Sequence, residues 1–137
     1  MVKVVVERLE EIAKGVYVLE FLRFFDFEPG QVIKLAWGSN EEPRLYSIAS
    51  GALDTNIQLV FNVVSDGTLT PRLADIKPGD QLYASKAFGR FICGDGPAWW
   101  IAAGPGIAPF ASMFRSGMQD DKVLIHGGKY ADSFYYE

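Results

Sequence analysis

Short apolar or alternating runs, each bounded by turn residues, fill the first two thirds of the chain. Alternation of apolar and polar residues with a period of two is typical of half-buried β-strands. Pro29-Gly30 and Pro78-Gly79 each precede such a run. This order suits a type II turn, because proline fixes φ and the glycine after it accepts a positive φ. The pattern predicts an all-β, six-stranded antiparallel barrel, whose closure leaves no open sheet edge. The expected strands are 2–8, 16–21, 32–37, 44–49, 57–64 and 81–84.

One short helix is expected to interrupt the strands. Thr70 is placed to be its N-cap, and Pro71 follows at the first helical position, where a missing N–H costs nothing. Gly67, just before, lets the backbone approach another group closely. Free N–H groups at a helix start, together with a hydroxyl, suit an anion. The same residues equally fit a simple capped helix that closes one end of the barrel.

The pattern changes after the glycine-rich segment 94–97. Runs 98–103 and 122–126 are almost wholly apolar, as in buried parallel strands, and 107–116 between them has helical spacing. The sequence therefore predicts a β-α-β unit of the α/β class. Its two strands are too few for an independent sheet.

Gly104-Pro105-Gly106 lies between the first of these strands and the helix. A glycine turn at this place can bring a pyrophosphate against helix amides. The common dinucleotide fingerprint requires a third glycine, where this chain has Pro109, so that fingerprint is not met. Asp132 or Ser133 is expected to cap a further helix.

Composition narrows the class of protein. The 137 residues carry a net charge of −4 and are 49% hydrophobic, which fits a globular protein with one full core and argues against nucleic acid as the main partner. No membrane-spanning run and no signal peptide are expected, so we predict a cytoplasmic protein. Cys93 is the only cysteine, so no intrachain disulfide or thiolate metal cage is expected. His126 ends an apolar strand, where a structural role is expected.

Arg44-Leu45-Tyr46-Ser47 is the stretch with the most distinctive chemistry. A guanidinium binds phosphate bidentately, a tyrosine offers a flat apolar face, and a serine hydroxyl can hydrogen-bond to a ring nitrogen. Together they could hold a molecule with a phosphate at one end and a flat ring at the other. Taken alone, the four residues also fit an ordinary edge strand.

The order of the motifs resembles the ferredoxin–NADP reductase family, most closely its bacterial ferredoxin/flavodoxin reductases. The resemblance covers nearly the whole chain. We expect the sequence to be a fragment, since that family's nucleotide domain continues beyond a β-α-β unit. The motifs that carry the resemblance are residues 27–31, 44–50, 66–73, 77–80, 104–110 and 123–127.

The resemblance implies an FAD-binding barrel over residues 1–95 and the truncated start of a Rossmann-like NADP-binding domain over 96–137. The implied activity is electron transfer between NADP(H) and ferredoxin or flavodoxin, by hydride transfer to flavin N5. We expect a monomer. The alternatives are an NADH-dependent reductase component of an oxygenase system and a non-catalytic flavin-binding or interaction module.

The resemblance also implies residue roles. Arg44 would hold the FAD pyrophosphate, while Tyr46 and Ser47, the two catalytic candidates, would lie against the isoalloxazine and near N5. Pro105 stands where relatives commonly have threonine, and Lys129 where they usually have an arginine for the 2′-phosphate, so contacts to the nucleotide are expected to be weaker there. The other implied cofactor-binding residues are Leu45, Val60, Gly67, Thr68, Leu69, Thr70, Gly104 and Gly128.

Overall fold

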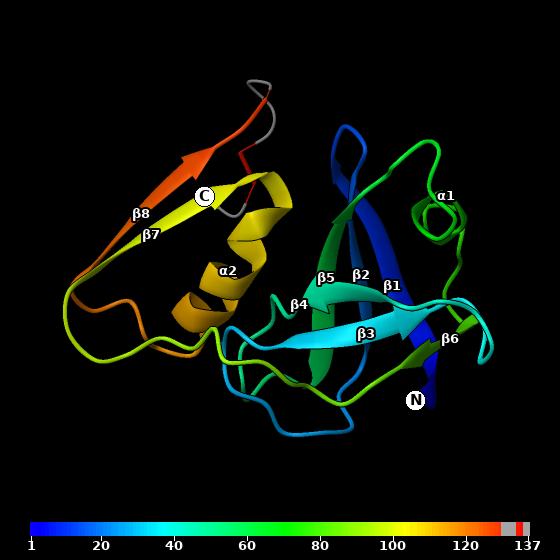
Figure 1. The fold of residues 1–137 in the computed structure, drawn as a ribbon, viewed down its shortest axis with the longest axis horizontal. Helices are drawn as coiled ribbons and strands as arrows, with labels where there is room; N and C mark the ends of the chain where they lie inside the picture. The colour runs from blue at the N-terminus through cyan, green and yellow to red at the C-terminus, as the bar shows by residue number, and fades with distance from the viewer. Residues whose placement is uncertain (130–133, 136–137) are drawn as a thin grey trace.

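The computed structural model describes residues 1–129, 134 and 135. It contains two sheets with one helix between them, and a second, short helix, α1 (Thr70–Leu73) (Figure 1). The larger sheet contains six antiparallel strands in the order β4-β3-β6-β1-β2-β5. These strands are β1 (Val2–Ala13), β2 (Val16–Leu22), β3 (Val32–Ala36), β4 (Arg44–Ser47), β5 (Asn56–Asn62) and β6 (Gln81–Ala84).

The two outer strands of this sheet meet, which gives it the form of a barrel. Ile48, just after β4, forms a bridge with Leu59 of β5. The Ala49 amide donates to the Gln58 carbonyl at 2.8 Å. Ile48 and Leu59 are buried, together with most inward residues of the other strands. The predicted antiparallel barrel is therefore confirmed.

Both proline–glycine turns have the predicted backbone conformation. Gly30 has φ of 105° and Gly79 has φ of 96°. In the first turn the Gln31 amide donates to the Glu28 carbonyl at 3.1 Å. Gly30 also lies against another segment, since a Cβ there would be 1.7 Å from the Phe91 carbonyl oxygen. Glycine at position 30 is thus required by conformation and by space.

Strand β1 is longer than predicted. It continues past Arg8 to Ala13 and forms a hairpin with β2, in which Ala13 pairs with Val16. The prediction ended too early because Glu10 and Glu11 interrupt the apolar alternation. Pairing with β2 maintains the strand where its own pattern does not.

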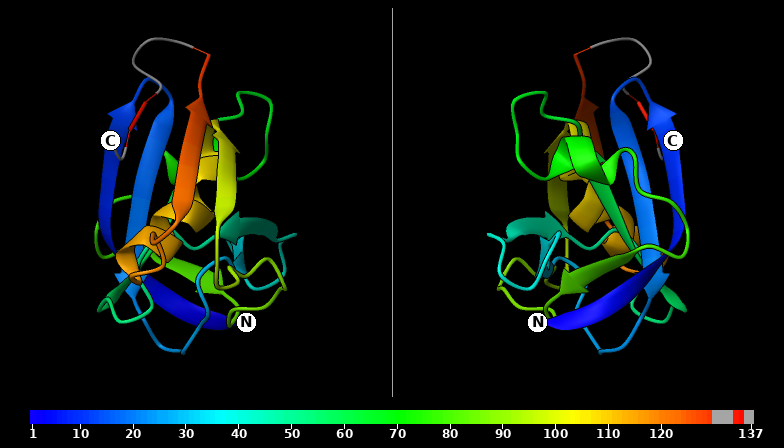
Figure 2. Two further views of the ribbon diagram at one scale, coloured as in Figure 1. Left: turned by 90° about the vertical axis from the view of Figure 1, so that its left-hand side faces the viewer. Right: turned by 90° about the vertical axis from the view of Figure 1, so that its right-hand side faces the viewer.

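The second sheet is the predicted β-α-β unit, which confirms the expected α/β element. β7 (Ala98–Ala103) pairs in parallel with β8 (Lys122–Gly127), from Ala98 opposite Lys122 to Ala103 opposite Gly127. Between them are a 3₁₀ turn, η1 (Gly104–Ile107), and helix α2 (Ala108–Arg115). α2 lies between this sheet and the barrel (Figure 1), and the left view of Figure 2 looks onto the sheet with α2 behind it.

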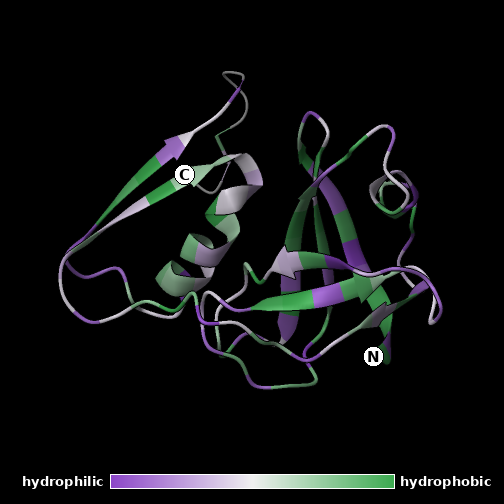
Figure 3. Ribbon diagram, in the orientation of Figure 1, coloured by the Kyte–Doolittle hydropathy of each residue, from purple (hydrophilic) through white to green (hydrophobic). Residues whose placement is uncertain are grey.

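The prediction that β7 and β8 are fully buried is wrong. Residues of β7 and β8 that are paired in register share a face, so Trp99 and Val123 are neighbours, as are Ile101 and Ile125. All four are exposed, Trp99 by 70% and Ile101 by 67%. The apolar colouring of these strands is visible in Figure 3. α2 covers only one face, and nothing in the described part of the chain covers the other.

Two further sequence predictions are not tested by the described residues. The helix expected to begin at Asp132 or Ser133 lies outside the described residues. The domain division near residue 95 stays a prediction, although the segment 94–97 does separate the two sheets. Among the described residues, no helix is long and apolar enough to span a membrane.

Candidate cofactor site

Strand β4 presents the four key residues on two faces. Successive side chains of a strand alternate, so Arg44 and Tyr46 lie on one face and Leu45 and Ser47 on the other. Leu45 is 60% exposed, whereas Tyr46 and Ser47 are half-buried. The guanidinium and the ring therefore share one face of the strand, and the Ser47 hydroxyl lies on the other. A flat molecule could contact both Tyr46 and Ser47 only at the end of the strand.

Tyr46 packs against the barrel core. Its ring meets Phe61 of β5 edge-on, with the centroids 6.4 Å apart and an interplanar angle of 69°. Burial raises the pKa of the Tyr46 hydroxyl above its ordinary value, although the charge of Arg44 acts in the opposite direction. The phenol is therefore neutral near pH 7 and can donate a hydrogen bond.

Arg44 is held at the surface by an exposed ion pair with Glu42, 3.1 Å between nitrogen and oxygen. The neighbouring Glu41 forms an ion pair with Arg72 of helix α1 (Thr70–Leu73). The Arg72 guanidinium also lies 4.9 Å from the centroid of the Trp37 ring. Exposed pairs contribute little, about 0–1 kcal/mol. A phosphate group can therefore compete with Glu42 for Arg44 at low cost.

Thr70 does not cap helix α1, which corrects the sequence prediction. It is the first helical residue, the N-cap position belongs to Leu69, and no side chain caps the helix. The Thr70 hydroxyl instead accepts a hydrogen bond of 2.8 Å from the Val64 amide. It is used to close the turn between β5 and α1, so the predicted anion site based on a hydroxyl cap loses that support.

The turn that precedes α1 is tightly packed. The Gly67 amide donates to the Val64 carbonyl at 2.8 Å, and a Cβ at Gly67 would lie 3.1 Å from that oxygen. Leu69 is buried in the barrel core, while Thr68 is exposed. The loop thus presents backbone and the Thr68 side chain to the outside and anchors itself through Leu69 and Thr70.

A cavity of about 310 Å³ brings the predicted nucleotide residues together. Gly104, Pro105 and Lys129 all line it. Lys14 from the β1–β2 turn and Asn62 at the end of β5 also line this cavity, and no sequence motif singles out either residue. Two lysines and a glycine turn at the carboxyl end of parallel strands are a suitable environment for an anion. Gly128 directly precedes Lys129 and is exposed.

His126 has a structural contact, as expected. Its Nε2 lies 3.2 Å from the Gly104 carbonyl oxygen, and its ring meets those of Phe134 and Tyr135 edge-on. This contact ties the end of β8 to the glycine turn after β7. The imidazole therefore fixes the turn that forms one wall of the cavity.

The carboxyl end of β5 connects the three groups of predicted residues. Phe61 contacts Tyr46, Asn62 and Val63 line the cavity with Gly104 and Lys129, and Val64 is bonded to Thr70. Val60 points the other way, into a second apolar cluster with residues of the β-α-β unit. Its side chain is therefore occupied by packing, and only its backbone is available for a cofactor.

A second cavity, of about 660 Å³, lies beside α2 between Phe110, Phe114 and Leu124. It is larger than the first, but none of its lining residues belongs to the predicted cofactor set. Its walls are mainly apolar, and they include Trp100 and Leu124 on the face of the β7–β8 sheet that α2 packs against. The residues predicted to bind the cofactor lie instead around the end of β5.

Several known proteins are similar to this chain over most of its length. No family model matches the chain. Over 121 residues it is 33% identical to a flavodoxin/ferredoxin–NADP reductase of Escherichia coli, and over 130 residues it is 32% identical to a probable dihydroorotate dehydrogenase B (NAD(+)) electron transfer subunit of Pyrococcus abyssi. These matches cover 80% and 93% of this chain. The chain spans about half the length of either relative, 49% in both cases.

The fold comparison agrees with the sequence comparison. A ferredoxin–NADP+ reductase of Neisseria gonorrhoeae, solved with bound FAD and NADP, superimposes with a TM-score of 0.90 at 20% identity, over 98% of this chain and 60% of that one. Identity this low shows the fold alone. Taken with the sequence matches, it indicates that the chain belongs to the ferredoxin–NADP reductase family.

Proposed function

We propose that the chain binds FAD along β4 and the loop 64–70, and that it takes part in electron transfer between NADP(H) and a one-electron carrier of the ferredoxin or flavodoxin type. The observation that carries the proposal is the convergence of three residue groups on Phe61–Val64 of β5 and its end. One strand end thereby adjoins the strand proposed to hold the ring, the loop proposed to face the phosphates, and the cavity lined by Lys14 and Lys129.

The residues of β4 fit the two ends of a flavin nucleotide. Arg44 is exposed, and within the described part of the chain its one ion pair is with Glu42, so its guanidinium is available to a pyrophosphate. Tyr46 offers a half-buried ring and a neutral hydroxyl, and Ser47 can donate to or accept from a ring nitrogen. A bound flavin would supply the acceptor for hydride and the donor for single electrons.

The protein's own part in this reaction is positioning. Tyr46 is fixed by Phe61 and limits the depth at which a ring can lie. Gly104, held by His126, leaves space beside it, since a Cβ at Gly104 would have no atom within 4 Å. A reaction between two bound groups requires their reacting atoms at about 3–3.5 Å. No side chain at the site needs to act as a strong acid or base.

A second candidate is electron transfer with NADH in place of NADPH. Lys129 retains the charge of an arginine but lacks its bidentate geometry, and Pro105 has neither N–H nor hydroxyl. The relative from Pyrococcus abyssi, described as an NAD(+) electron transfer subunit, matches 93% of this chain. These features favour weak discrimination between NADPH, which carries the 2′-phosphate, and NADH, which lacks it.

Anaerobic reduction of the FAD-loaded protein tests both candidates. NADPH or NADH is mixed with the protein, and bleaching of the visible flavin band is followed in time. The first candidate predicts faster bleaching with NADPH, and a Lys129→Ala variant that loses this preference. Equal or faster bleaching with NADH would favour the second candidate. Bleaching by neither nucleotide would contradict both for this chain.

A further inference from the structure

The segment 49–52, which only Ile48 separates from β4, is bound to both β5 and α2. The Ser50 hydroxyl accepts a hydrogen bond of 3.0 Å from the backbone amide of Gln58. The Ser50 carbonyl accepts one of 2.6 Å from the Ser112 hydroxyl of α2. Ser50 and Ser112 are both buried. Buried polar groups in such mutual contact favour one arrangement of the elements that carry them.

The end of α2 extends these contacts. Arg115 Nη1 donates to the Ala49 carbonyl at 3.1 Å and to Gln58 Oε1 at 2.7 Å, and the Ala52 amide donates to the Ser116 hydroxyl at 2.9 Å. A Cβ at Gly51 would lie 2.9 Å from the Arg115 carbonyl oxygen. The helix end therefore lies directly against this segment, without room for a side chain between them.

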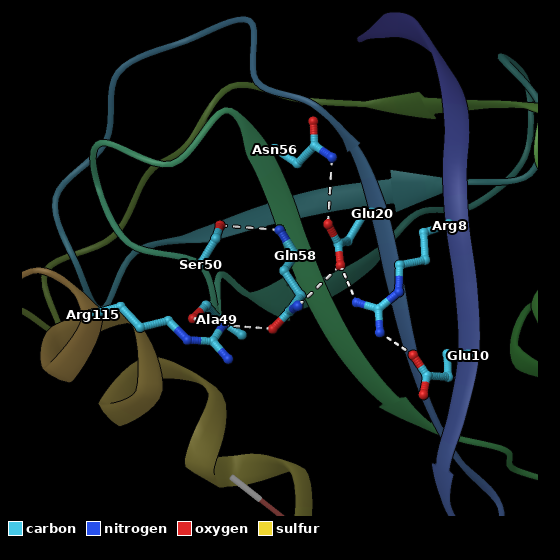
Figure 4. A network of polar contacts seen from close by, with 8 residues as sticks. All are labelled: Arg8, Glu10, Glu20, Ala49, Ser50, Asn56, Gln58 and Arg115. Atoms are coloured by element: carbon cyan, nitrogen blue, oxygen red, sulfur yellow. Dashed lines mark hydrogen bonds and ion pairs between the residues drawn. The ribbon is translucent and has the colours of Figure 1, made fainter.

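Gln58 is itself held from the opposite side. Its Nε2 donates to Glu20 at 3.2 Å, and Glu20 accepts further hydrogen bonds from Arg8 and Asn56 (Figure 4). The side-chain amide of Gln58 is thus fixed with its oxygen toward Arg115 and its nitrogen toward Glu20. An amide can satisfy a cation and an anion together only in this orientation.

An apolar contact lies beside the polar one. Val60 and Val18 of the barrel belong to one buried cluster with Trp100, Phe110 and Met113 of the β-α-β unit. Apolar contacts are not directional, so they stabilise association without fixing an angle. Hydrogen bonds are directional, and those of Gln58, Ser50 and Arg115 add the orientation that apolar packing does not supply.

We propose that residues 49–52, Gln58, Ser112 and Arg115 form a joint that fixes the orientation of α2, and of the glycine turn before it, relative to β4. This inference rests on the proposed function, since β4 and the turn are there assigned to the flavin and to the pyridine nucleotide. Gln58 and Arg115 are positioning residues, because they act through β4 and α2. Only Ile48 separates this joint from the end of β4, so a movement of α2 is transmitted to β4 over a single residue.

Hydrogen exchange of the whole chain tests the joint. Gln58→Ala removes the side-chain contacts to Arg115 and Glu20, and Arg115→Lys retains the charge with fewer donors. Loss of these contacts is expected to speed exchange of the α2 amides 110–115 about tenfold in Gln58→Ala, and by less in Arg115→Lys. Amides of the barrel core, such as Leu19 and Leu59, should change less than about twofold. The matched control is Gln81→Ala on β6, since Gln81 is exposed and its side chain has no hydrogen bond among the described residues.

The same variants loaded with FAD test the link to β4. The circular dichroism of bound flavin in the visible range should change in Gln58→Ala and not in Gln81→Ala. Unchanged exchange of α2, or an equal increase throughout the barrel, would overturn the joint. Faster α2 exchange with an unchanged flavin spectrum would overturn its link to β4. Failure of the wild type to bind FAD would contradict the proposed function, while exchange alone still decides whether the joint exists.

Discussion

Replacing Thr70 by valine removes one hydroxyl and keeps the shape of the side chain. Thr70 is only 8% exposed, and its hydroxyl accepts the Val64 amide at 2.8 Å. An unsatisfied buried donor costs about 1–3 kcal/mol. Val64 is itself exposed by 51%, so water can take over part of the bond, and we expect a loss near the lower limit, about 1 kcal/mol. For a chain of this length that corresponds to a fall in Tm of roughly 3–5 °C.

The same loss of stability in Thr70→Val should weaken the binding of FAD. If the turn 64–70 must be closed to bind phosphate, a loss of about 1 kcal/mol in its closed form raises the apparent Kd for FAD by up to about fivefold. Thr70→Ser retains the hydroxyl and should remain close to wild type in both measurements. Urea unfolding followed by tryptophan fluorescence gives the stability, and titration with FAD gives the Kd.

The control for this experiment is Thr55→Val. Thr55 is exposed and its hydroxyl has no hydrogen bond among the described residues, so the same change of side chain removes no contact there. If Thr70→Val and Thr55→Val unfold at the same urea concentration, the Thr70 hydroxyl does not hold the turn. If Thr70→Val is destabilised but binds FAD like the wild type, the turn does not belong to the flavin site.

Three other predictions concern the remainder of the structure. Gly30→Ala should destabilise the protein by more than about 2 kcal/mol in urea unfolding, because positive φ and the Phe91 carbonyl both oppose a Cβ, whereas Gly79→Ala should lose only about 1 kcal/mol from positive φ. Burial raises the pKa of the Glu20 carboxyl, but its hydrogen bonds, first of all that from Arg8, outweigh burial and lower the pKa below 4.5. The extra stability of wild type over Glu20→Gln should therefore be present above pH 4.5 and be lost as the pH falls through the lowered pKa. Trp99→Thr should leave the free energy of unfolding in urea within about 0.5 kcal/mol of wild type, because this ring is mostly exposed. A loss of more than about 2 kcal/mol would contradict the exposed position of this ring.

The local parts of the fold could be predicted from the sequence. Proline–glycine pairs at 29–30 and 78–79 predict turns by their own backbone preferences, and the run 98–103 predicts β7 with its observed limits. The order of strands in the barrel, by contrast, depends on contacts between distant segments. The bridge between Ile48 and Leu59 has no local signal, so closure was inferred from strand number and not from any residue.

The site was predicted less completely than the fold. The chemistry of Arg44–Ser47 and the glycine turn at Gly104 are visible in the sequence, but the use of the Thr70 hydroxyl is not, because a threonine before proline has the same pattern whether it caps a helix or closes a turn. Gln58 and Arg115 were missed for a similar reason. Each is an ordinary polar residue in its own element, and only the packing of α2 on β5 brings them together.

Titration of the purified chain with FAD is the most direct test of the central claim. We predict a yellow, saturable complex with one FAD per chain. Loss of a charge-assisted hydrogen bond, worth about 1.5–3 kcal/mol, should weaken it about 10- to 100-fold in Arg44→Ala. Arg90→Ala is the control, because Arg90 is an exposed arginine outside the predicted site. A wild-type chain that does not bind FAD, or an Arg44→Ala variant with unchanged affinity, would contradict the account.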